Sequence, residues 1–481
     1  QTLSVQHLFF CMTPVLLQGG RAFAGHGFIT SHAAPLGSHE LDFAYCKAAQ
    51  RSRATWKNHC GTRRQCTSSK SHACDRITVP RRDLLRKLLV GVAGVATAGA
   101  LRRSCRAKVV SENVVVPLQW REGAFCFRYN VASTAEAARD RADGALTSYW
   151  GVADTGSPFM LVARCLRKDC PGYCARWGCF HGEGQLTGIP DSFEGYASGL
   201  NEMQWRRGAA LRFPDASPAG EVFGGDLRFG VQGRIIGAGG TGNGVFFGLV
   251  RDRMEDIQPS FLEQTDFTSL GFDLRKPGAE ALTLSSSNLM QRSDAVLALV
   301  DPRQWGDPIR HYAAIARSIS VGGEELLVEG SRRQSRRVLC IFDTGTTGAS
   351  MTPSLYEQYL NTVRRHAEQG EPMAQARQLV ASFALPDGGK EMSLELFRGR
   401  HPAYGSALGL VTPMEEVAWA GVGPPASLAN YRVPGQQGAI TDFQRPFDDV
   451  MFLGLGFLIG RELTIDAIGG RLAITPQRTM A

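Results

Sequence analysis

The tetrapeptide Asp-Thr-Gly-Ser at 154–157 returns 189 residues later as Asp-Thr-Gly-Thr at 343–346, and each copy closes a short apolar run. A single copy constrains little, because Asp and Gly gather in ordinary turns for backbone reasons. Two copies in one chain predict two similar lobes that bring Asp154 and Asp343 to one place. The rest of the sequence should then divide into two comparable halves.

The composition favours a β-rich fold in the second part of the chain. Gly 55 and Pro 23 indicate many turns and short strands. From residue 109 on, β-branched or aromatic runs separated by turn residues predict strands at 114–118, 125–131, 209–213, 221–229, 245–250 and 281–284. Helical stretches should be few, and apolar residues at helical intervals predict the clearest of them at Pro353–Glu368 and at 373–382.

Landmarks recur in the same order in both halves. Each half has an apolar strand that enters Asp-Thr-Gly and, later, an apolar-apolar-Gly step, at 246–248 and at 452–454. With these motifs the chain resembles the pepsin-like aspartic proteases over roughly 114–476. The resemblance implies an all-β, bilobal fold of two β-barrel-like lobes with an active-site cleft between them. The N-terminal lobe would span 109–275 and the C-terminal lobe 276–481.

The chemistry of that family explains why two carboxylates are needed. Two carboxyl groups about 3 Å apart cannot both ionise readily, so they share one proton. One can then activate a water while the other protonates the carbonyl, and the pair titrates as a unit. The resemblance thus implies an aspartic endopeptidase that cuts protein or peptide substrates at acidic pH through Asp154 and Asp343. No cofactor and no metal are expected.

Six neighbours would support the catalytic pair: Thr155, Gly156, Ser157, Thr344, Gly345 and Thr346. The two glycines let the backbone turn tightly and approach the carboxylates. The hydroxyls of Ser157 and Thr346 can hydrogen-bond the outer carboxylate oxygens. The resemblance further implies that Thr155 and Thr344 tie the two loops together.

A third element of the site is Tyr196, which lies 42 residues after Asp154 and precedes Ala-Ser-Gly. The resemblance implies that it is the Tyr of a flap, a hairpin tip that covers the cleft, excludes water and donates a hydrogen bond. Leu161 stands where the family usually carries the Trp that supports this Tyr. The other function class that we consider is a catalytically inactive pepsin-fold binding or inhibitor-like protein. Such proteins usually lack an Asp or the flap Tyr, and this chain has all three.

Cysteine use divides evenly, with six of the 12 in residues 1–108. Four of the others fall within fifteen residues: Cys165, Cys170, Cys174 and Cys179. Two local disulfides of undetermined connectivity are predicted there, with a zinc site that includes His181 as the alternative. Cys126 and Cys340 would stay as buried thiols.

Residues 1–108 have the pattern of a targeting presequence. They hold 17 Lys or Arg against four acids, whereas the whole chain is only +8, so the body is mildly acidic and offers no case for nucleic-acid binding. An apolar run with an A-x-A site, a Ser- and Arg-rich stretch, and Arg81-Arg82 before the apolar run 88–101 suggest secretory, transit and twin-arginine signals in series. Together they favour a plastid and its thylakoid lumen, with a secretory or endomembrane compartment as the alternative.

The run 88–101 could instead anchor the chain in a membrane. It is 14 residues long, short of the roughly 20 needed to span a bilayer, so we expect no stable span in the mature, monomeric protein.

Two other motifs have structural interpretations. Gly237–Gly242 matches G-x-G-x-x-G but precedes a strand-like run, which predicts a loop. Arg332–Arg337 predicts a solvated hairpin, with a processing site as the alternative.

Overall fold

The computed structural model describes a defined subset of the chain. The described residues are 10–11, 112–132, 148–164, 170–180, 185–186, 192–196, 199–217, 221–236, 245–252, 259–291, 295–305, 307, 309–328, 334–386, 388, 391–414 and 446–475. The expectations for the loop at 237–242 and, apart from Phe10–Cys11, for the targeting signals lie outside them.

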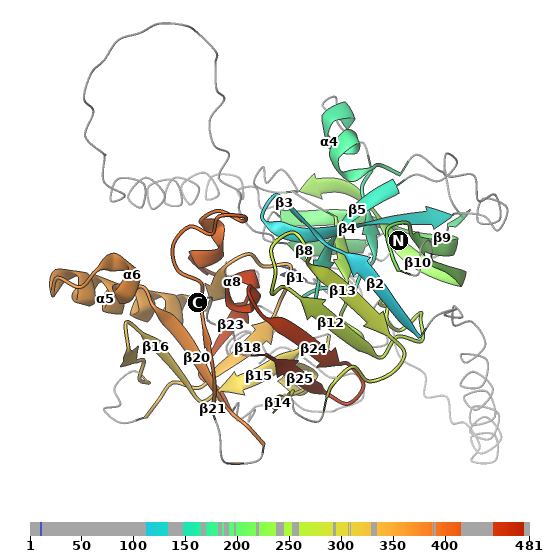
Figure 1. The fold of residues 1–481 in the computed structure, drawn as a ribbon. Helices are drawn as coiled ribbons and strands as arrows, with labels where there is room; N and C mark the ends of the chain where they lie inside the picture. The colour runs from blue at the N-terminus through green and yellow to red at the C-terminus, as the bar shows by residue number, and fades with distance from the viewer. Residues whose placement is uncertain are drawn as a thin grey trace, which may run out of the picture. The chain divides into compact units, whose positions relative to one another are not determined.

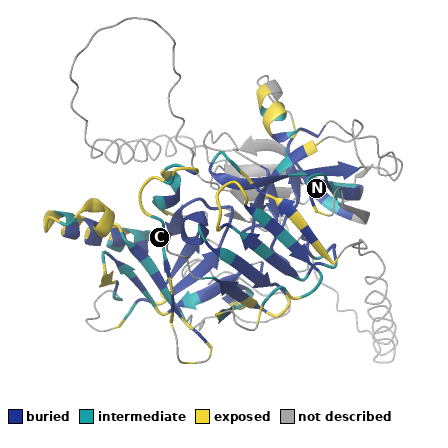
Figure 2. Cartoon of the chain, viewed as in Figure 1, coloured by how far each residue is buried: buried dark blue, intermediate teal, exposed yellow. Residues whose placement is uncertain are grey.

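The described residues form mostly strands, which confirms the coarse all-β prediction (Figure 1). Their helices are α4 (Cys170–Trp177), α5 (Pro353–Glu368), α6 (Met373–Ala376) and α8 (Leu455–Leu458), with short 3-10 turns η3 (Pro302–Trp305) and η4 (Ala407–Gly409). Helix α5 has the predicted bounds, and it buries Leu355, Tyr359 and Val363 along one face while its outer face is exposed (Figure 2). None of these helices is long and apolar enough to cross a membrane.

The second predicted helix, at 373–382, is wrong over most of its length. Helix α6 ends at Ala376, and strand β20 (Leu379–Ala384) follows. Alternate residues of β20 are buried, and the strand pairs on both sides, with β16 and β21. Pairing on both sides therefore stabilises a strand over the expected helix, and Leu379, Ala381 and Phe383 face the core from it.

A ten-stranded sheet contains the first Asp-Thr-Gly turn. Its strands are β1 (Phe10–Cys11), β3 (Gln119–Arg121), β4 (Ala124–Ala132), β5 (Ser148–Asp154), β6 (Leu161–Val162), β7 (Gln185–Leu186), β8 (Ser192–Tyr196), β9 (Gly199–Phe213), β10 (Glu221–Ile236) and β11 (Phe246–Gly248). Strand β5 lies between β4 and the parallel strand β11, so the first apolar-apolar-Gly step runs beside the strand that ends at Asp154.

The second turn belongs to a five-stranded sheet in the order β15-β18-β23-β19-β22. Its strands are β15 (Ala313–Ala316), β18 (Val338–Phe342), β19 (Ala349–Met351), β22 (Val411–Pro413) and β23 (Asp449–Leu453). Strand β23, which carries the second apolar-apolar-Gly step, is parallel to β18. A four-stranded sheet of β16 (Ser318–Val321), β17 (Glu324–Glu325), β20 and β21 (Glu391–Glu395) completes this half.

A six-stranded sheet draws strands from both halves. It consists of β2 (Asn113–Pro117), β12 (Ser269–Asp273), β13 (Ala281–Ser285), β14 (Val296–Ala298), β24 (Glu462–Asp466) and β25 (Arg471–Ile474). Strand β12 pairs with β13 on one side and with β24 on the other. The expected lobe boundary at 275/276 thus falls in the turn between two paired strands of this sheet.

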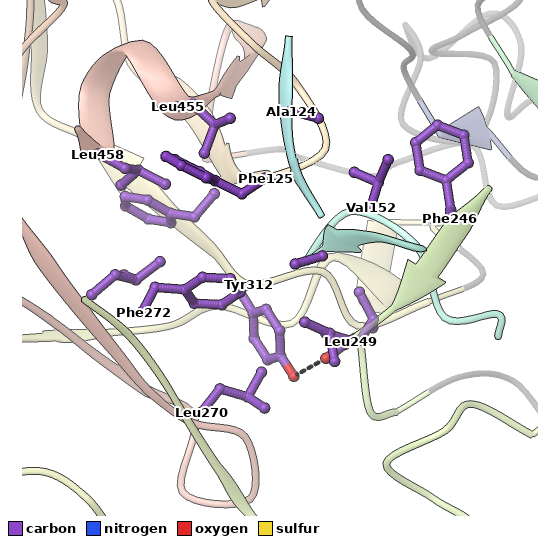
Figure 3. Close-up of a cluster of buried hydrophobic side chains, with 14 of the residues drawn as sticks. Ala124, Phe125, Val152, Phe246, Leu249, Leu270, Phe272, Tyr312, Leu455 and Leu458 are labelled. Carbon is purple, nitrogen blue, oxygen red and sulfur yellow. Dashed lines mark hydrogen bonds between the residues drawn. The ribbon is translucent and has the colours of Figure 1, made fainter. Parts of the chain in front are cut away.

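One large hydrophobic cluster runs through all of these sheets. Figure 3 shows part of it, where Phe125 of β4 and Phe272 of β12 lie near Leu458 of α8. Tyr312 lies in the same cluster and donates its hydroxyl hydrogen bond to the Leu249 carbonyl at 2.8 Å. Side chains far apart in the sequence therefore share one core, which fixes the elements that carry the two Asp-Thr-Gly turns.

The cysteines follow the disulfide prediction as far as they are described. Cys174 and Cys179 form a disulfide at the end of α4. Cys165 and the side chain of Cys170 lie outside the described residues. A disulfide removes two of the four candidate thiolate ligands, so the zinc alternative is wrong for this pair. Cys126 and Cys340 are free, buried thiols.

The basic run at 332–337 is only partly as expected. Arg336 is 8% exposed, and its guanidinium forms an ion pair with the buried Asp449 at 3.1 Å. The interpretation of this run as a solvated hairpin is therefore wrong for Arg336. The buried carboxylate of Asp449 explains the difference, because it offers a charged partner that the local sequence does not reveal.

Candidate active site

The first Asp-Thr-Gly turn begins where β5 ends. The last four residues of β5 are buried, and Asp154 is 1% exposed. Gly156 N–H donates to Asp154 Oδ1 at 2.8 Å. Leu249 N–H, just beyond β11, donates to the Asp154 backbone carbonyl at 2.7 Å. The carboxylate is therefore held from its own turn, and its backbone is held from the neighbouring parallel strand.

The second turn repeats this arrangement. Asp343 directly follows β18, whose five residues are all buried, and is itself 1% exposed. Gly345 N–H donates to Asp343 Oδ1 at 2.8 Å, and the Thr346 hydroxyl donates to Asp343 Oδ2 at 2.7 Å. Asp343 N–H donates to the Leu453 carbonyl of β23 at 3.0 Å. Both oxygens of this carboxylate thus have a fixed donor.

Each glycine of these turns packs against the carboxylate of the other turn. A Cβ atom on Gly156 would lie 2.6 Å from Cγ and Oδ1 of Asp343, and one on Gly345 would lie 2.5 Å from Oδ1 of Asp154. Real Cβ atoms do not approach other atoms so closely. The two turns therefore meet face to face, and only glycine leaves room for the opposite carboxylate.

Two threonines join the turns through reciprocal hydrogen bonds. Thr155 N–H donates to Thr344 Oγ1 at 3.1 Å, and Thr344 N–H donates to Thr155 Oγ1 at 3.0 Å. Each hydroxyl in turn donates to a carbonyl that precedes the opposite Asp, that of Phe342 at 2.7 Å and that of Ala153 at 2.6 Å. Both threonines are fully buried, so these four bonds form away from competing water.

This geometry gives the site its chemical capacity. Two buried carboxyl groups on facing turns can act together as acceptor and donor of a proton. The Thr346 hydroxyl donates to Asp343 as expected, and the Ser157 hydroxyl accepts a hydrogen bond from Phe159 N–H at 3.4 Å. No protein-family model matches the chain, and the comparison with curated proteins returns no match.

Tyr196 lies at the end of β8, at a hairpin. β9 begins at Gly199, and Tyr196 and Gly199 pair across the two antiparallel strands. Tyr196 is therefore the last paired residue of β8 in this hairpin, and its role as a flap residue stays a prediction. The side chain of Tyr196 lies outside what the structure describes.

Leu161, which replaces the expected Trp, is buried in β6. The indole of Trp205, on β9, packs edge-on against Phe159 with the ring centroids 5.2 Å apart. A Cβ on Gly230 would touch both Leu161 and Trp205, at 2.7 and 3.3 Å. A Trp is thus present beside the first turn, but it comes from the strand that follows Tyr196.

His311 was not found by sequence reasoning, although it touches the first turn. Its Nε2 lies 3.1 Å from the Gly156 carbonyl oxygen, and its Nδ1 lies 2.6 Å from Asp307 Oδ2. Burial lowers the pKa of His311, but the charge and hydrogen bond of Asp307, the Gly156 carbonyl and the charge of Asp343 together raise this pKa above its ordinary value. Only the spacing of Asp307 and His311, four residues apart, could have suggested the pair.

A metal site would need several ligating side chains close together. Over the residues that the structure describes, no group of three or more His, Cys, Asp or Glu side chains is placed to hold a metal ion.

Proposed function

We propose that the protein is an aspartic endopeptidase of the pepsin-like class, which hydrolyses peptide bonds with a water activated between Asp154 and Asp343. The observation that carries this proposal is the reciprocity of the two turns, in which each glycine lies against the opposite carboxylate. The same class would account for the parallel apolar-apolar-Gly strand beside each Asp-Thr-Gly strand and for the sheet to which both halves contribute strands. The assignment of a fold with two lobes and a cleft between them is part of this proposal.

In the proposed reaction one carboxyl group is ionised and the other is protonated. The ionised group takes a proton from water as its oxygen attacks the peptide carbonyl carbon, and the protonated group gives its proton to the carbonyl oxygen. The product of this step is a gem-diol. The carboxyl group that took the water proton then gives it to the amide nitrogen. As the C–N bond breaks, the other carboxylate takes a proton from a gem-diol hydroxyl, which releases a carboxylic acid and an amine and leaves the pair with one proton again.

The proposed substrate is an extended peptide with apolar side chains around the cleaved bond. A peptide that binds as a strand presents alternate side chains to pockets and its backbone to hydrogen-bonding partners. The β8–β9 hairpin, with Tyr196 at its tip, would cover the peptide and exclude water. Trp205 on β9 would stiffen this hairpin from the side on which Leu161 replaces the usual Trp.

Digestion of casein and of a fluorogenic apolar peptide between pH 3 and pH 7 tests the proposal. We expect the full chain to cleave both at acidic pH and to be inhibited by pepstatin. Asp154→Asn and Asp343→Asn should each abolish cleavage. Asp273→Asn is the matched control, because Asp273 is half-buried and its ion pair is local, with Arg275.

Two results would count against the proposal in different ways. Cleavage that survives Asp154→Asn would refute the assignment of the catalytic pair. A folded wild-type chain that cleaves neither substrate but binds pepstatin or a peptide, by calorimetry, would favour the inactive pepsin-fold binding protein.

A further inference from the structure

A buried aspartate and histidine reach the first catalytic turn from outside it. Asp307 follows η3 and is 1% exposed, and His311 precedes β15 and is 5% exposed. The ring of His311 lies between Asp307 Oδ2, 2.6 Å from Nδ1, and the Gly156 carbonyl oxygen, 3.1 Å from Nε2. The mechanism proposed above uses neither side chain.

The partners of the ring determine how many protons the pair must hold. A carbonyl oxygen only accepts, so the Nε2 atom has to carry a proton. The Nδ1 atom faces a carboxylate oxygen, and a proton must lie between them as well. The pair therefore holds two protons, as an imidazolium beside a carboxylate. Loss of one would leave either a lone pair against the Gly156 carbonyl or a buried, uncompensated carboxylate.

The residue that His311 contacts is the one that touches both members of the proposed pair. Gly156 N–H holds Asp154 Oδ1 at 2.8 Å, and the Cα of Gly156 lies against the Asp343 carboxylate, where a Cβ would come within 2.6 Å of Cγ. A small movement of Gly156 would therefore change the position of both carboxylates. His311 holds Gly156 from a third side, through a hydrogen bond to the Gly156 carbonyl oxygen.

The charged groups around His311 favour its protonated form. Asp307 acts from its own segment, Asp343 acts from the turn after β18, and the bond to the Gly156 carbonyl adds to both. Arg303 of η3 interacts with Asp307 by charge, and its own carboxylate partner is Asp301. From β23 the neighbour of the ring is uncharged, the Phe452 side chain, with ring centroids 6.3 Å apart.

We propose that His311, held by Asp307, is a positioning residue of this active site: it keeps Gly156 between the two carboxylates and places a positive charge beside them. The proposal rests on the proposed function. Positioning should appear in kcat, because a displaced catalytic group reacts more slowly even when substrate is bound. The charge should appear in the pH profile, because a nearby cation favours the ionised form of a carboxylate.

Two variants separate these effects. His311→Ala removes the donor to Gly156, and we expect kcat to fall about 10- to 100-fold with little change in KM. The double variant Asp307→Asn/His311→Gln retains an amide donor and an amide partner but no charge. Its kcat should be close to that of the wild type, and its pH–kcat profile should be displaced to higher pH by about one unit.

His366→Gln is the matched control. His366 on α5 is also buried, at 8% exposure, and pairs with a carboxylate, Glu371, at 2.9 Å, but it has no bond to either catalytic turn. Its profile should superimpose on that of the wild type. A double variant whose pH profile also superimposes on the wild type would overturn the charge effect, and an unchanged kcat in folded His311→Ala would overturn the positioning role.

A spectroscopic measurement tests the proposal without enzyme activity. In the full chain with 15N-labelled histidine, the signals lost in His311→Gln identify the His311 ring. We expect both of its nitrogens to show the chemical shifts of a protonated imidazolium at pH 6. An Nε2 shift typical of an unprotonated nitrogen would overturn the proposal. This readout distinguishes a failure here from a chain that simply does not cleave peptides.

Discussion

Thr155 and Thr344 exchange hydrogen bonds across the two Asp-Thr-Gly turns, with each N–H donating to the hydroxyl of the other residue at 3.1 and 3.0 Å. Each hydroxyl then donates to a carbonyl before the opposite Asp. The two turns lie 189 residues apart in the sequence, yet neither can shift without breaking bonds to the other. The site is therefore a single cooperative unit.

Thr155→Val should reduce the free energy of unfolding by about 1–3 kcal/mol, because it leaves the buried Thr344 N–H and Phe342 carbonyl without their partner. Thr344→Val should cost a similar amount. The double variant should cost less than the sum, with a coupling of about 0.5–3 kcal/mol. Urea unfolding of the four proteins measures this cycle.

Thr412→Val is the control for this cycle, since Thr412 is exposed and its hydroxyl bond to the Ala349 carbonyl is long, at 3.4 Å. It should change stability by no more than about 0.5 kcal/mol. Strictly additive costs for the two threonines would mean that the turns are held independently of each other.

Gly156→Ala and Gly345→Ala should each reduce kcat by about 100-fold, because the new methyl group would displace the opposite carboxylate. Overpacking should also cost about 1–3 kcal/mol of stability. Gly172→Ala is the matched control, since a Cβ there meets nothing within 4 Å. Peptide cleavage and urea unfolding give both quantities. Full activity in Gly156→Ala would show that the two turns do not pack as described.

Asp449→Ala should destabilise the fold by about 3–5 kcal/mol, because it leaves Arg336 buried without the carboxylate that compensates its charge. The same carboxylate accepts hydrogen bonds from Thr352 and Ser354, at 2.6 and 2.5 Å. The exposed pair Asp273–Arg275 provides the control, and Asp273→Ala should cost at most about 1 kcal/mol. Equal costs in thermal or urea unfolding would argue against burial as the cause.

Burial raises the pKa of the Cys126 and Cys340 thiols, so both should stay protonated and unreactive at pH 8. Peptide mapping after iodoacetamide treatment should find these two cysteines unlabelled in the folded protein and labelled in urea. Cys174 and Cys179 should be labelled only after reduction, because they form a disulfide. Rapid labelling of Cys126 without denaturant would mean that this part of the core opens readily.

The features that could be predicted from the sequence have local signals. The repeated tetrapeptide pointed to Asp154 and Asp343, and the helical spacing of Leu355, Tyr359 and Val363 predicted α5 with its bounds. The β-rich class followed from turn residues and short apolar runs. In each case the prediction rests on residues close together in the sequence, because their backbone preferences or their periodicity indicate the structure.

The features that sequence reasoning missed depend on partners far away in the chain. Arg336 was expected to be solvated, but it forms an ion pair with the buried Asp449, which lies 113 residues later. Residues 379–384 form a strand because β16 and β21 flank them, although the local pattern favoured a helix. The role proposed for His311 depends on its contact with the Gly156 carbonyl, which lies 155 residues earlier in the chain. Tertiary contacts of this kind leave no periodic pattern.

The raised pKa of His311 makes stability depend on pH in a definite direction. In the unfolded chain the histidine pKa is about 6.5, so between that pH and the raised value the folded protein holds one more proton than the unfolded chain. Its contribution to stability is thus complete below about pH 6.5 and is lost as pH rises through the folded value. The slope cannot exceed about 1.4 kcal/mol per pH unit for one proton.

Urea unfolding at pH 5.5, 6.5, 7.5 and 8.5 measures this dependence. The wild type should lose stability towards high pH more steeply than Asp307→Asn/His311→Gln, in which no proton is bound at this place. Parallel curves for the wild type and the double variant would mean that His311 binds its proton equally in both states. Since Asp307 and Gly156 contact the ring only in the folded chain, the difference between the curves isolates their effect on His311.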